Sequence, residues 1–210
     1  MMKAKFDVIC HAPQVGVCGL NCKHCWVTDN LKQNKPLDEV KQMIDAMAEL
    51  REEPVLAETT ILYFLDELTL HPDLIEILRY CRERDVLPQQ FLVSNGLGLA
   101  SRENWTEILN ELKKCGLKGF LMTINGDAEY HDWFTGVEGS FDKTLTATRR
   151  ANAYGFKVVW NMYLTNGNLP KVIEAARMKG DERFRVTVPI STIRWIHSDI
   201  HPDIDVLNGV

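Results

Sequence analysis

The sequence lacks a hydrophobic run long enough to span a membrane, and its first residues, Met1 to Asp7, lack the apolar core of a signal peptide. It also lacks low-complexity tracts, linkers and strong internal repeats. Positive charge is not in excess: the net charge of -5, from 24 Lys and Arg against 29 Asp and Glu, argues against non-specific binding to nucleic acid. These absences predict a cytoplasmic protein without a membrane or nucleic-acid partner.

The 210 residues, 45% of them hydrophobic, are enough for one domain with a sizeable core, so residues 1–210 are predicted to form a single domain. Short apolar segments alternate along it with amphipathic ones. Most of the short segments are apolar throughout, as strands buried on both faces are. The predicted strands are Val15–Val17, Thr60–Leu65, Gln90–Ser94, Gly119–Asn125, Lys157–Leu164 and Phe184–Val188.

Five amphipathic helices are predicted between these strands. They run from Pro36 through Met47, from Pro72 through Cys81, from about Ser101 to Cys115, from about Asp142 to Tyr154, and from Asn168 to about Gly180. Strand–helix alternation implies parallel strands joined by right-handed crossovers. A closed eight-unit barrel usually needs ~250 residues, so six units predict an α/β fold that is a partial (β/α)6 TIM-like barrel, open on one side.

The densest chemistry lies in the run Cys18-Gly-Leu-Asn-Cys22-Lys-His-Cys25, which places three thiols within eight residues. Three thiolates at this spacing can hold a metal centre and leave one coordination position free. The run follows the first predicted strand, and in parallel α/β folds the functional site lies at the carboxyl ends of the strands. The sequence therefore predicts a metal centre in this run, in a reducing compartment.

Two kinds of metal centre fit this run. A structural zinc ion takes four Cys or His ligands, and Cys10, Cys81 and Cys115 are isolated, so His11 or His24 would supply the fourth. An iron–sulfur cluster is normally held by four thiolates, and with three it keeps one iron open to a substrate or cofactor. The spacing favours the cluster and leaves zinc as the alternative.

The run resembles the C-x3-C-x-Φ-C motif of radical S-adenosylmethionine (radical SAM) enzymes, where Φ is usually aromatic and His24 takes its place. The resemblance implies that Cys18, Cys22 and Cys25 bind a [4Fe–4S] cluster whose fourth iron is chelated by the amino and carboxylate groups of SAM. It further implies reductive cleavage of SAM to methionine and a 5′-deoxyadenosyl radical that abstracts hydrogen from a substrate. His24 would lie near the adenine, or else be a solvated loop residue.

A second segment, Leu65 to Leu74, is similar to the family's G-G-E-P-L-L-H-P-D-L. It keeps Glu67, His71, Pro72, Asp73 and Leu74 but has Leu65 and Asp66 in place of the glycines. The resemblance implies that Asp66 and Glu67 lie where the SAM amino group binds. The alternative is a solvated turn at Asp66 and Glu67. For His71 and Asp73 a capping role at the start of the next helix is preferred.

Three further polar positions follow predicted strands. Ser94-Asn95-Gly96 resembles the S-N-G or T-N-G of the family, where a hydroxyl or amide approaches SAM. Asn125 takes the place of the acidic residue in S-x-D-G, which implies a contact with the SAM ribose. Asn161 matches a polar family position facing the cofactor, and strand alternation places Tyr163 on the same face.

The segment His131 to Phe141 resembles the H-D-x-x-x-G-x-x-G-S-F stretch of the subgroup that includes peptide-modifying and molybdopterin-type enzymes. It is interpreted as a structural loop entering the fourth helix, with a catalytic His131 as the minor alternative. The C-terminal tail, residues 190–210, contains no cysteine, so the chain resembles the core domain without an auxiliary-cluster domain. In that tail Ser191, Arg194, Trp195 and His197 either close the barrel or contact substrate, or simply cover its surface.

The resemblance predicts an oxidoreductase, transferase or isomerase that acts on a peptide or a small molecule and receives electrons from a donor such as flavodoxin or ferredoxin. No residue is assigned to the substrate reaction. The replacement of Gly-Gly by Leu65-Asp66 favours an alternative from another class. In that alternative the chain is a non-catalytic zinc or iron–sulfur barrel that regulates or binds a partner.

Overall fold

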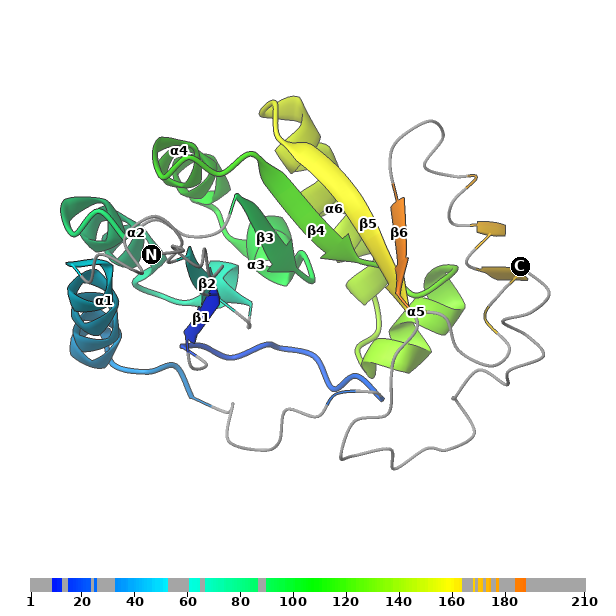
Figure 1. Ribbon diagram of the computed structural model, residues 1–210. Coiled ribbons are helices and arrows are strands. Elements are labelled where there is room, and N and C mark those ends of the chain that lie inside the picture. Colours follow the sequence, from blue (N-terminus) through cyan, green and yellow to red (C-terminus); the bar gives the residue numbers. More distant parts are fainter. Residues whose placement is uncertain are drawn as a thin grey trace, which may run out of the picture.

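The computed structural model describes residues 9–12, 15–23, 25, 33–52, 61–64, 67–86, 90–163, 168, 170, 171, 173, 174, 177 and 184–187. Strands and helices alternate along the chain, with the helices on the outside of the sheets (Figure 1). The elements are β1 Ile9–Ala12, α1 Leu37–Glu52, β2 Ile61–Phe64, η2 Leu68–Leu70, α2 Leu74–Glu83, β3 Phe91–Ser94, α3 Leu97–Ser101, α4 Trp105–Lys114, β4 Gly119–Thr123, α5 Ala128–Thr135, α6 Ser140–Ala153, β5 Lys157–Tyr163 and β6 Phe184–Thr187.

The described strands form two parallel sheets. One pairs β1 with β2, and the other has the order β3-β4-β5-β6. Every pairing in both sheets is parallel, which confirms the predicted α/β fold with crossover helices. The sheets are open rather than closed into a complete barrel, as Figure 1 shows. The carboxyl ends of β3, β4 and β5 therefore lie along one edge, where a site is expected.

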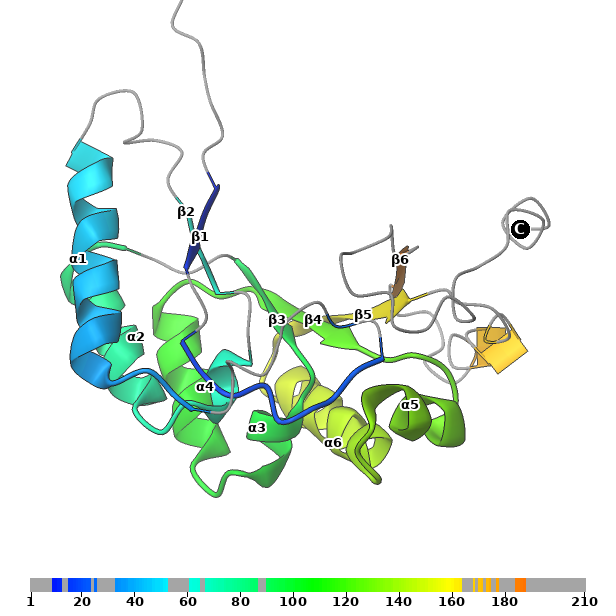
Figure 2. The same ribbon diagram turned by 90° about the horizontal axis from the view of Figure 1, so that it is seen from below.

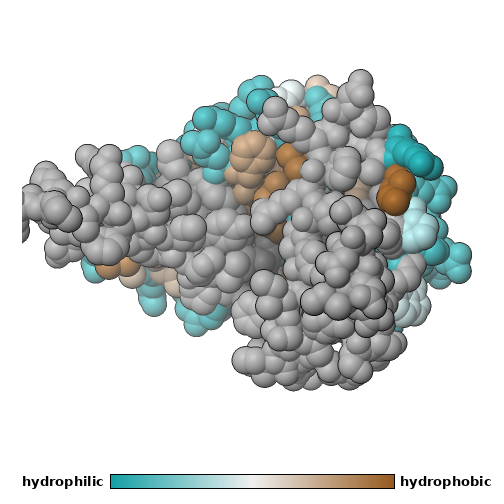
Figure 3. All heavy atoms as spheres, turned by 45° about the vertical axis from the view of Figure 1, so that its right-hand side comes forward, coloured by the Kyte–Doolittle hydropathy of each residue, from teal (hydrophilic) through white to brown (hydrophobic). Residues whose placement is uncertain are grey.

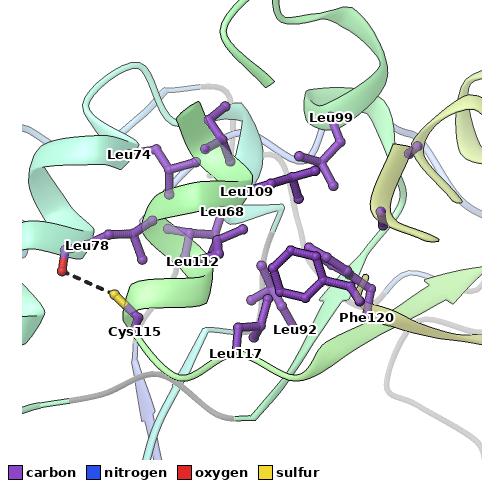
Figure 4. Packing of buried hydrophobic residues seen from close by; sticks show 14 of the residues in the cluster. Leu68, Leu74, Leu78, Leu92, Leu99, Leu109, Leu112, Cys115, Leu117 and Phe120 are labelled. Carbon is purple, nitrogen blue, oxygen red and sulfur yellow. Dashed lines mark hydrogen bonds between the residues drawn. The ribbon is translucent and has the colours of Figure 1, made fainter. Parts of the chain in front are cut away.

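The core lies between the sheets and the helices that cover them. Figure 4 shows Leu68, Leu74 and Leu78 of η2 and α2 packed against Leu109 and Leu112 of α4, and all five are fully buried. Burying a leucine side chain contributes about 1.5–3 kcal/mol. This packing holds η2 and α2 against α4.

Two cysteines belong to this core. Burial raises the pKa of Cys81 to about 12 and that of Cys115 to about 11, so both remain protonated thiols at neutral pH. The Cys115 thiol donates to the carbonyl of Leu78 at 3.4 Å (Figure 4). Both side chains are buried, Cys81 within α2 and Cys115 directly after α4.

The predicted first strand is wrong. Residues 15–17 are not in a strand, and β1 instead covers Ile9–Ala12. The carbonyl of Val15 accepts from the N–H of Lys35 at 2.9 Å, and the N–H of Val17 donates to the side chain of Asn34 at 3.1 Å. The backbone around Val15 and Val17 is thus hydrogen-bonded to the segment before α1 and not to a neighbouring strand.

The predicted helix from Ser101 to Cys115 is α4, which begins four residues later, at Trp105, and ends at Lys114. A short helix that was not predicted, α3, precedes it and ends at Ser101. Gly96, at φ 83°, precedes α3, and Arg102 has an extended backbone that ends it before α4 begins at Trp105. The second helix, predicted to begin at Pro72, begins at Leu74 after a turn. The segment from His131, which was predicted to be a loop, begins inside α5, and that helix ends at Thr135. The helix starts after Asp127, whose carboxylate accepts from the N–H of Tyr130 at 2.8 Å and caps it.

The described surface in Figure 3 is hydrophilic around much of its margin, with small hydrophobic areas between. Three large hydrophobic side chains are exposed in the described part of the chain: Leu50, Trp133 and Ile173. Among the helices of the described residues, none is long and apolar enough to cross a membrane.

Candidate functional site

The cysteine loop, residues 18–25, runs from the side of β1 toward α5 (Figures 1 and 2). Its three cysteines are half-buried free thiols. The N–H of Cys25 donates to the carbonyl of Cys22 at 3.0 Å, so a tight turn brings these two residues together. The predicted adenine neighbour, His24, lies outside the described residues.

The first end of the cysteine loop is held by the segment that follows β3. The side-chain amide of Asn95 donates to the carbonyl of Cys18 at 2.8 Å and lies 3.4 Å from its sulfur. Gly19 has φ 76°, and a Cβ added there would lie 3.0 Å from Leu97 and 3.2 Å from Leu70. The left-handed backbone conformation therefore favours glycine here, and any larger residue would also displace the two leucine side chains.

The other end of the loop is held by the C-terminus of α5. The N–H of Asn21 donates to the carbonyl of Thr135 at 2.8 Å, and the N–H of Lys23 donates to that of Phe134 at 2.9 Å. The last carbonyls of a helix have no partner inside it, so the loop supplies the missing donors. Gly136 ends α5 at φ 68°, and a Cβ on it would lie 3.2 Å from the carbonyl oxygen of Asn21.

Asp132 fixes the chain after α5. Its carboxylate accepts from the N–H groups of Gly139 at 2.6 Å and Phe141 at 2.9 Å, and from the Ser140 hydroxyl at 2.9 Å. Burial alone would raise the pKa of Asp132, but these hydrogen bonds lower it below its ordinary value. The H-D-x-x-x-G-x-x-G-S-F resemblance thus corresponds to a structural support that holds the cysteine loop.

Glu67 is buried, so the alternative of a solvated turn is wrong for this residue. Its carboxylate accepts from the Thr69 hydroxyl, from the Ser94 hydroxyl at 2.9 Å to both oxygens, and from the N–H of Asn95 at 2.5 Å. A buried carboxylate is tolerated only when it is hydrogen-bonded in this way. It joins the turn after β2 to the end of β3. Its neighbour Asp66 lies outside the described residues.

His71 has the capping role that the sequence predicted. Its Nδ1 accepts from the N–H of Asp73 at 3.1 Å, at the start of α2, and its Nε2 lies 3.1 Å from the carbonyl oxygen of Lys35. The Asp73 side chain makes no cap hydrogen bond, although the residue takes the N-cap position. His71 therefore joins α2 to the segment before α1.

Asn125 lies just beyond β4 and is completely buried, yet its side-chain oxygen and nitrogen have no hydrogen-bond partner in the described structure. Leaving a buried polar group unpaired costs about 1–3 kcal/mol, so such a pair of atoms fits a missing ligand. Asn161 pairs in register with Thr123 on the neighbouring strand and is half-buried, as is Tyr163. The alternation in β5 confirms that Asn161 and Tyr163 share a face.

The side chain of His131 is hydrogen-bonded to the backbone of Asn125. Its Nδ1 accepts from the N–H of Asn125 at 3.2 Å, which places its proton on Nε2, and burial lowers its pKa to about 4. The Nε2–H is buried and has no partner among the described groups. His131 is therefore a neutral hydrogen-bond donor at neutral pH and is not a charged acid.

Burial and neighbouring groups raise the pKa values of two thiols in the cysteine loop. Burial, and after it the negative charge of Glu67, raises the pKa of Cys18 to about 11. Burial and the Cys18 and Cys25 sulfurs raise the pKa of Cys22 well above its usual range. Thiols in this state release their protons when a metal cation binds. No three His, Cys, Asp or Glu side chains in the described ranges gather as a ready-made metal site.

Residues 15–178 match the sequence profile of the Radical SAM superfamily. The chain belongs to the radical SAM superfamily. This membership confirms the predicted relationship and identifies an enzyme fold in which a [4Fe–4S] cluster and SAM are implied by the family. The thiol-rich loop, hydrogen-bonded at both ends, and the unpaired Asn125 fit that cofactor pair.

Two curated relatives come from Methanosarcina barkeri. The chain is 31% identical to an AdoMet-dependent heme synthase over 189 residues, covering 87% of this chain and 50% of the relative. It is 28% identical to an Fe-coproporphyrin III synthase over 144 residues, covering 67% of this chain and 33% of the relative. The chain thus spans half the length or less of these relatives.

The structure is also similar to that of anSMEcpe with bound AdoMet, with a TM-score of 0.62 and 20% sequence identity. The similarity covers 91% of this chain and 53% of that one. It supports the fold, and the predicted TIM-like, open α/β barrel is confirmed.

The structure brings some of the predicted site residues together. Glu67, Ser94, Asn95 and Cys18 form one hydrogen-bonded series from the turn after β2 to the cysteine loop. The sequence placed Asn168 only at the start of a predicted helix. In the structure its side chain donates to the carbonyls of Tyr163 at 2.7 Å and Asn125 at 3.3 Å and so ties the ends of β5 and β4. These two hydrogen bonds could not be predicted, because the partners of Asn168 are known only once the strands are aligned.

Proposed function

We propose that this chain cleaves SAM reductively, using a [4Fe–4S] cluster held by Cys18, Cys22 and Cys25. The observation that carries the proposal is the cysteine loop itself: three free thiols on a segment fixed from β3 and from α5, in a chain of the radical SAM superfamily. When bound, the cluster supplies the electron that splits SAM into methionine and a 5′-deoxyadenosyl radical.

The polar residues at the strand ends would then bind and orient SAM. The buried amide of Asn125 is proposed to pair with the ribose, because its two polar atoms have no other partner in the described structure. Asn161 lies on the adjacent strand in register with Thr123 and is proposed to line the same site. His24 beside the adenine and Asp66 at the SAM ammonium group are proposals from the family resemblance alone.

Glu67 and Ser94 are proposed to act by shaping the site. The Ser94 hydroxyl donates to Glu67 and accepts from the N–H of Gly96 at 2.9 Å, so its hydrogen bonds are directed within the protein. Its effect on SAM would come through the position of the strand end. This differs from the direct contacts that the family resemblance predicts for both residues.

The assay for SAM cleavage is 5′-deoxyadenosine formation under anaerobic conditions. The protein is reconstituted with iron and sulfide and given SAM and dithionite, which stands in for a proposed flavodoxin or ferredoxin donor. Wild type should form 5′-deoxyadenosine, and Cys22→Ala should lose both iron and product. The matched control Cys81→Ala, which removes a core thiol, should keep both.

Three outcomes would reject this proposal in whole or in part. A colourless protein that retains zinc after reconstitution supports the structural zinc alternative. A brown protein that forms no 5′-deoxyadenosine supports a non-catalytic iron–sulfur barrel. If Cys22→Ala keeps its full iron content, the assignment of the ligands is wrong.

A tetrapyrrole is the substrate class that we propose to test first. The two curated relatives named above are a heme synthase and an Fe-coproporphyrin III synthase, and the match to the first covers 87% of this chain. An iron porphyrin should increase 5′-deoxyadenosine formation and be altered in mass. If only a peptide substrate has these effects, the tetrapyrrole proposal is wrong while SAM cleavage stands.

A further inference from the structure

The side chain of Asn95 contacts the first cysteine of the loop at two atoms. Its Nδ2 lies 2.8 Å from the carbonyl oxygen of Cys18 and 3.4 Å from the Cys18 sulfur. The first distance is a strong N–H···O hydrogen bond, and the second is within reach of an N–H···S hydrogen bond. A single amide group therefore holds both the backbone and the sulfur of this residue.

A third hydrogen bond fixes the orientation of this amide. The Oδ1 of Asn95 accepts from the N–H of Leu97 at 2.9 Å. Only the carbonyl oxygen of an amide can accept that hydrogen, so the NH2 group must face Cys18. The donor toward the sulfur is thus set by α3 and not by a free rotation of the side chain.

The backbone of Asn95 is equally fixed. Its N–H donates to the Glu67 carboxylate at 2.5 Å, and its carbonyl accepts from the Thr144 hydroxyl at 2.7 Å. The next residue, Gly96, has φ 83°, and a Cβ on it would lie 2.9 Å from the Cα of Thr144. Asn95 is therefore held by Glu67 just before η2, by α3 and by α6, between a buried carboxylate and a cysteine sulfur.

We propose that Asn95 is a positioning residue that orients Cys18 and donates an N–H···S hydrogen bond to it, thereby raising the reduction potential of the cluster. This inference rests on the proposed function, because it takes Cys18 to be a cluster ligand. A donor beside a ligating sulfur stabilises the negative charge that is added on reduction. The carboxylate of Glu67 acts in the opposite direction, and Asn95 lies between the two.

Three variants separate this role from a general structural one. Asn95→Ala removes the donor to Cys18. Asn95→Asp keeps an oxygen for the N–H of Leu97 but replaces the donor by a second acceptor. Thr144→Val is the matched control, because it removes a hydrogen bond to the backbone of Asn95 and leaves the side-chain amide in place.

The measurement is the midpoint potential of the reconstituted cluster, followed by electron paramagnetic resonance during a redox titration. Asn95→Ala should shift the potential to a more negative value than wild type, and Asn95→Asp should shift it further because it adds negative charge. Thr144→Val should leave it unchanged.

The failure of this inference can be told from the failure of the proposed function. If wild type binds a cluster and cleaves SAM but the Asn95 variants keep the wild-type potential, Asn95 does not act on the sulfur. An equal shift in Thr144→Val would show a general effect of loop disorder and also overturn it. If wild type binds no cluster, the proposed function fails and the inference fails with it.

Discussion

At the scale of single residues, the carboxylate of Glu67 holds the end of β3 in place. It is buried and accepts from Thr69, Ser94 and the N–H of Asn95. Glu67→Gln replaces one acceptor oxygen by a donor that faces other donors. We expect the free energy of unfolding to fall by about 2–3 kcal/mol, since hydrogen bonds to buried charges are worth that much.

Urea unfolding measures this loss. The matched control is Glu107→Gln on α4, where the carboxylate is half exposed and pairs with Arg79 at 3.5 Å. Such surface pairs contribute about 0–1 kcal/mol, so the control should unfold near the wild-type midpoint. Equal effects of the two substitutions would show that Glu67 has no special structural role.

His131 predicts a pH dependence of stability. Its pKa is about 4 in the folded chain and 6.5 ordinarily, because burial disfavours the charged ring. The unfolded chain takes up the proton first, so stability is fully present above about pH 6.5 and is lost as the pH falls toward 4. The loss is at most about 3 kcal/mol, at 1.36 kcal/mol per unit of pKa.

The variant His131→Gln removes this titration and is the direct comparison. Its stability should change less than that of wild type between pH 6.5 and pH 4.5, although its stability at neutral pH is lower. Asp132 loses its hydrogen-bonded charge only at lower pH and does so in both proteins. Parallel pH profiles of the two proteins would contradict the assignment of a buried neutral His131.

At the scale of elements, the C-terminus of α5 packs against the cysteine loop where Gly136 lies next to Asn21. Gly136→Ala adds a Cβ 3.2 Å from the carbonyl oxygen of Asn21, in addition to the strain of a residue at φ 68°. We expect it to destabilise the fold more than Gly116→Ala, at φ 81° with nothing within 4 Å of an added Cβ. Both variants carry the left-handed penalty of about 1–2 kcal/mol.

The difference in the free energy of unfolding between these two glycine variants, measured in urea, reports the contact between α5 and the cysteine loop. Gly136→Ala should also speed alkylation of Cys22 in the iron-free protein, while Gly116→Ala should not. If both variants lose the same stability and neither changes the alkylation rate, α5 does not hold the cysteine loop.

Some of the strands could be predicted from the sequence and others could not. The buried strands β3, β4 and β5 were predictable because their apolar runs are bounded by glycines and polar residues. The first strand was misplaced because Val15 and Val17 look like strand residues, whereas their backbone groups bond to residues 34 and 35. Partners that distant carry no local pattern.

For the candidate site, too, some features could be predicted from the sequence and others could not. The spacing of the cysteines and the S-N-G segment at the end of β3 predicted a site at one edge of the sheet, and the structure places Asn95 within hydrogen-bond distance of Cys18. The role of Asn95 was not predictable, because the hydrogen bonds of this residue reach 77 residues back to Cys18 and 28 residues back to Glu67. The helix α5 was read as a loop because its cap and its end, Asp127 and Gly136, are also turn residues.

At the scale of the whole molecule, the chain is an open parallel α/β fold of the radical SAM superfamily that spans half the length or less of its two curated relatives. The cysteine loop is bonded to the segment after β3 and to α5, which are far apart in the sequence. A cluster bound there would link these parts and stabilise the folded state over the unfolded one.

The cysteine loop is proposed to hold a cluster with one iron open to SAM. The most direct measurement is the electron paramagnetic resonance spectrum of the reduced, reconstituted protein before and after SAM is added. We predict a [4Fe–4S] spectrum that changes on addition of SAM in wild type and is absent in Cys22→Ala. A cluster spectrum that SAM leaves unchanged would show that no iron is open to SAM, and one that survives in Cys22→Ala would show that this loop does not hold the cluster as proposed.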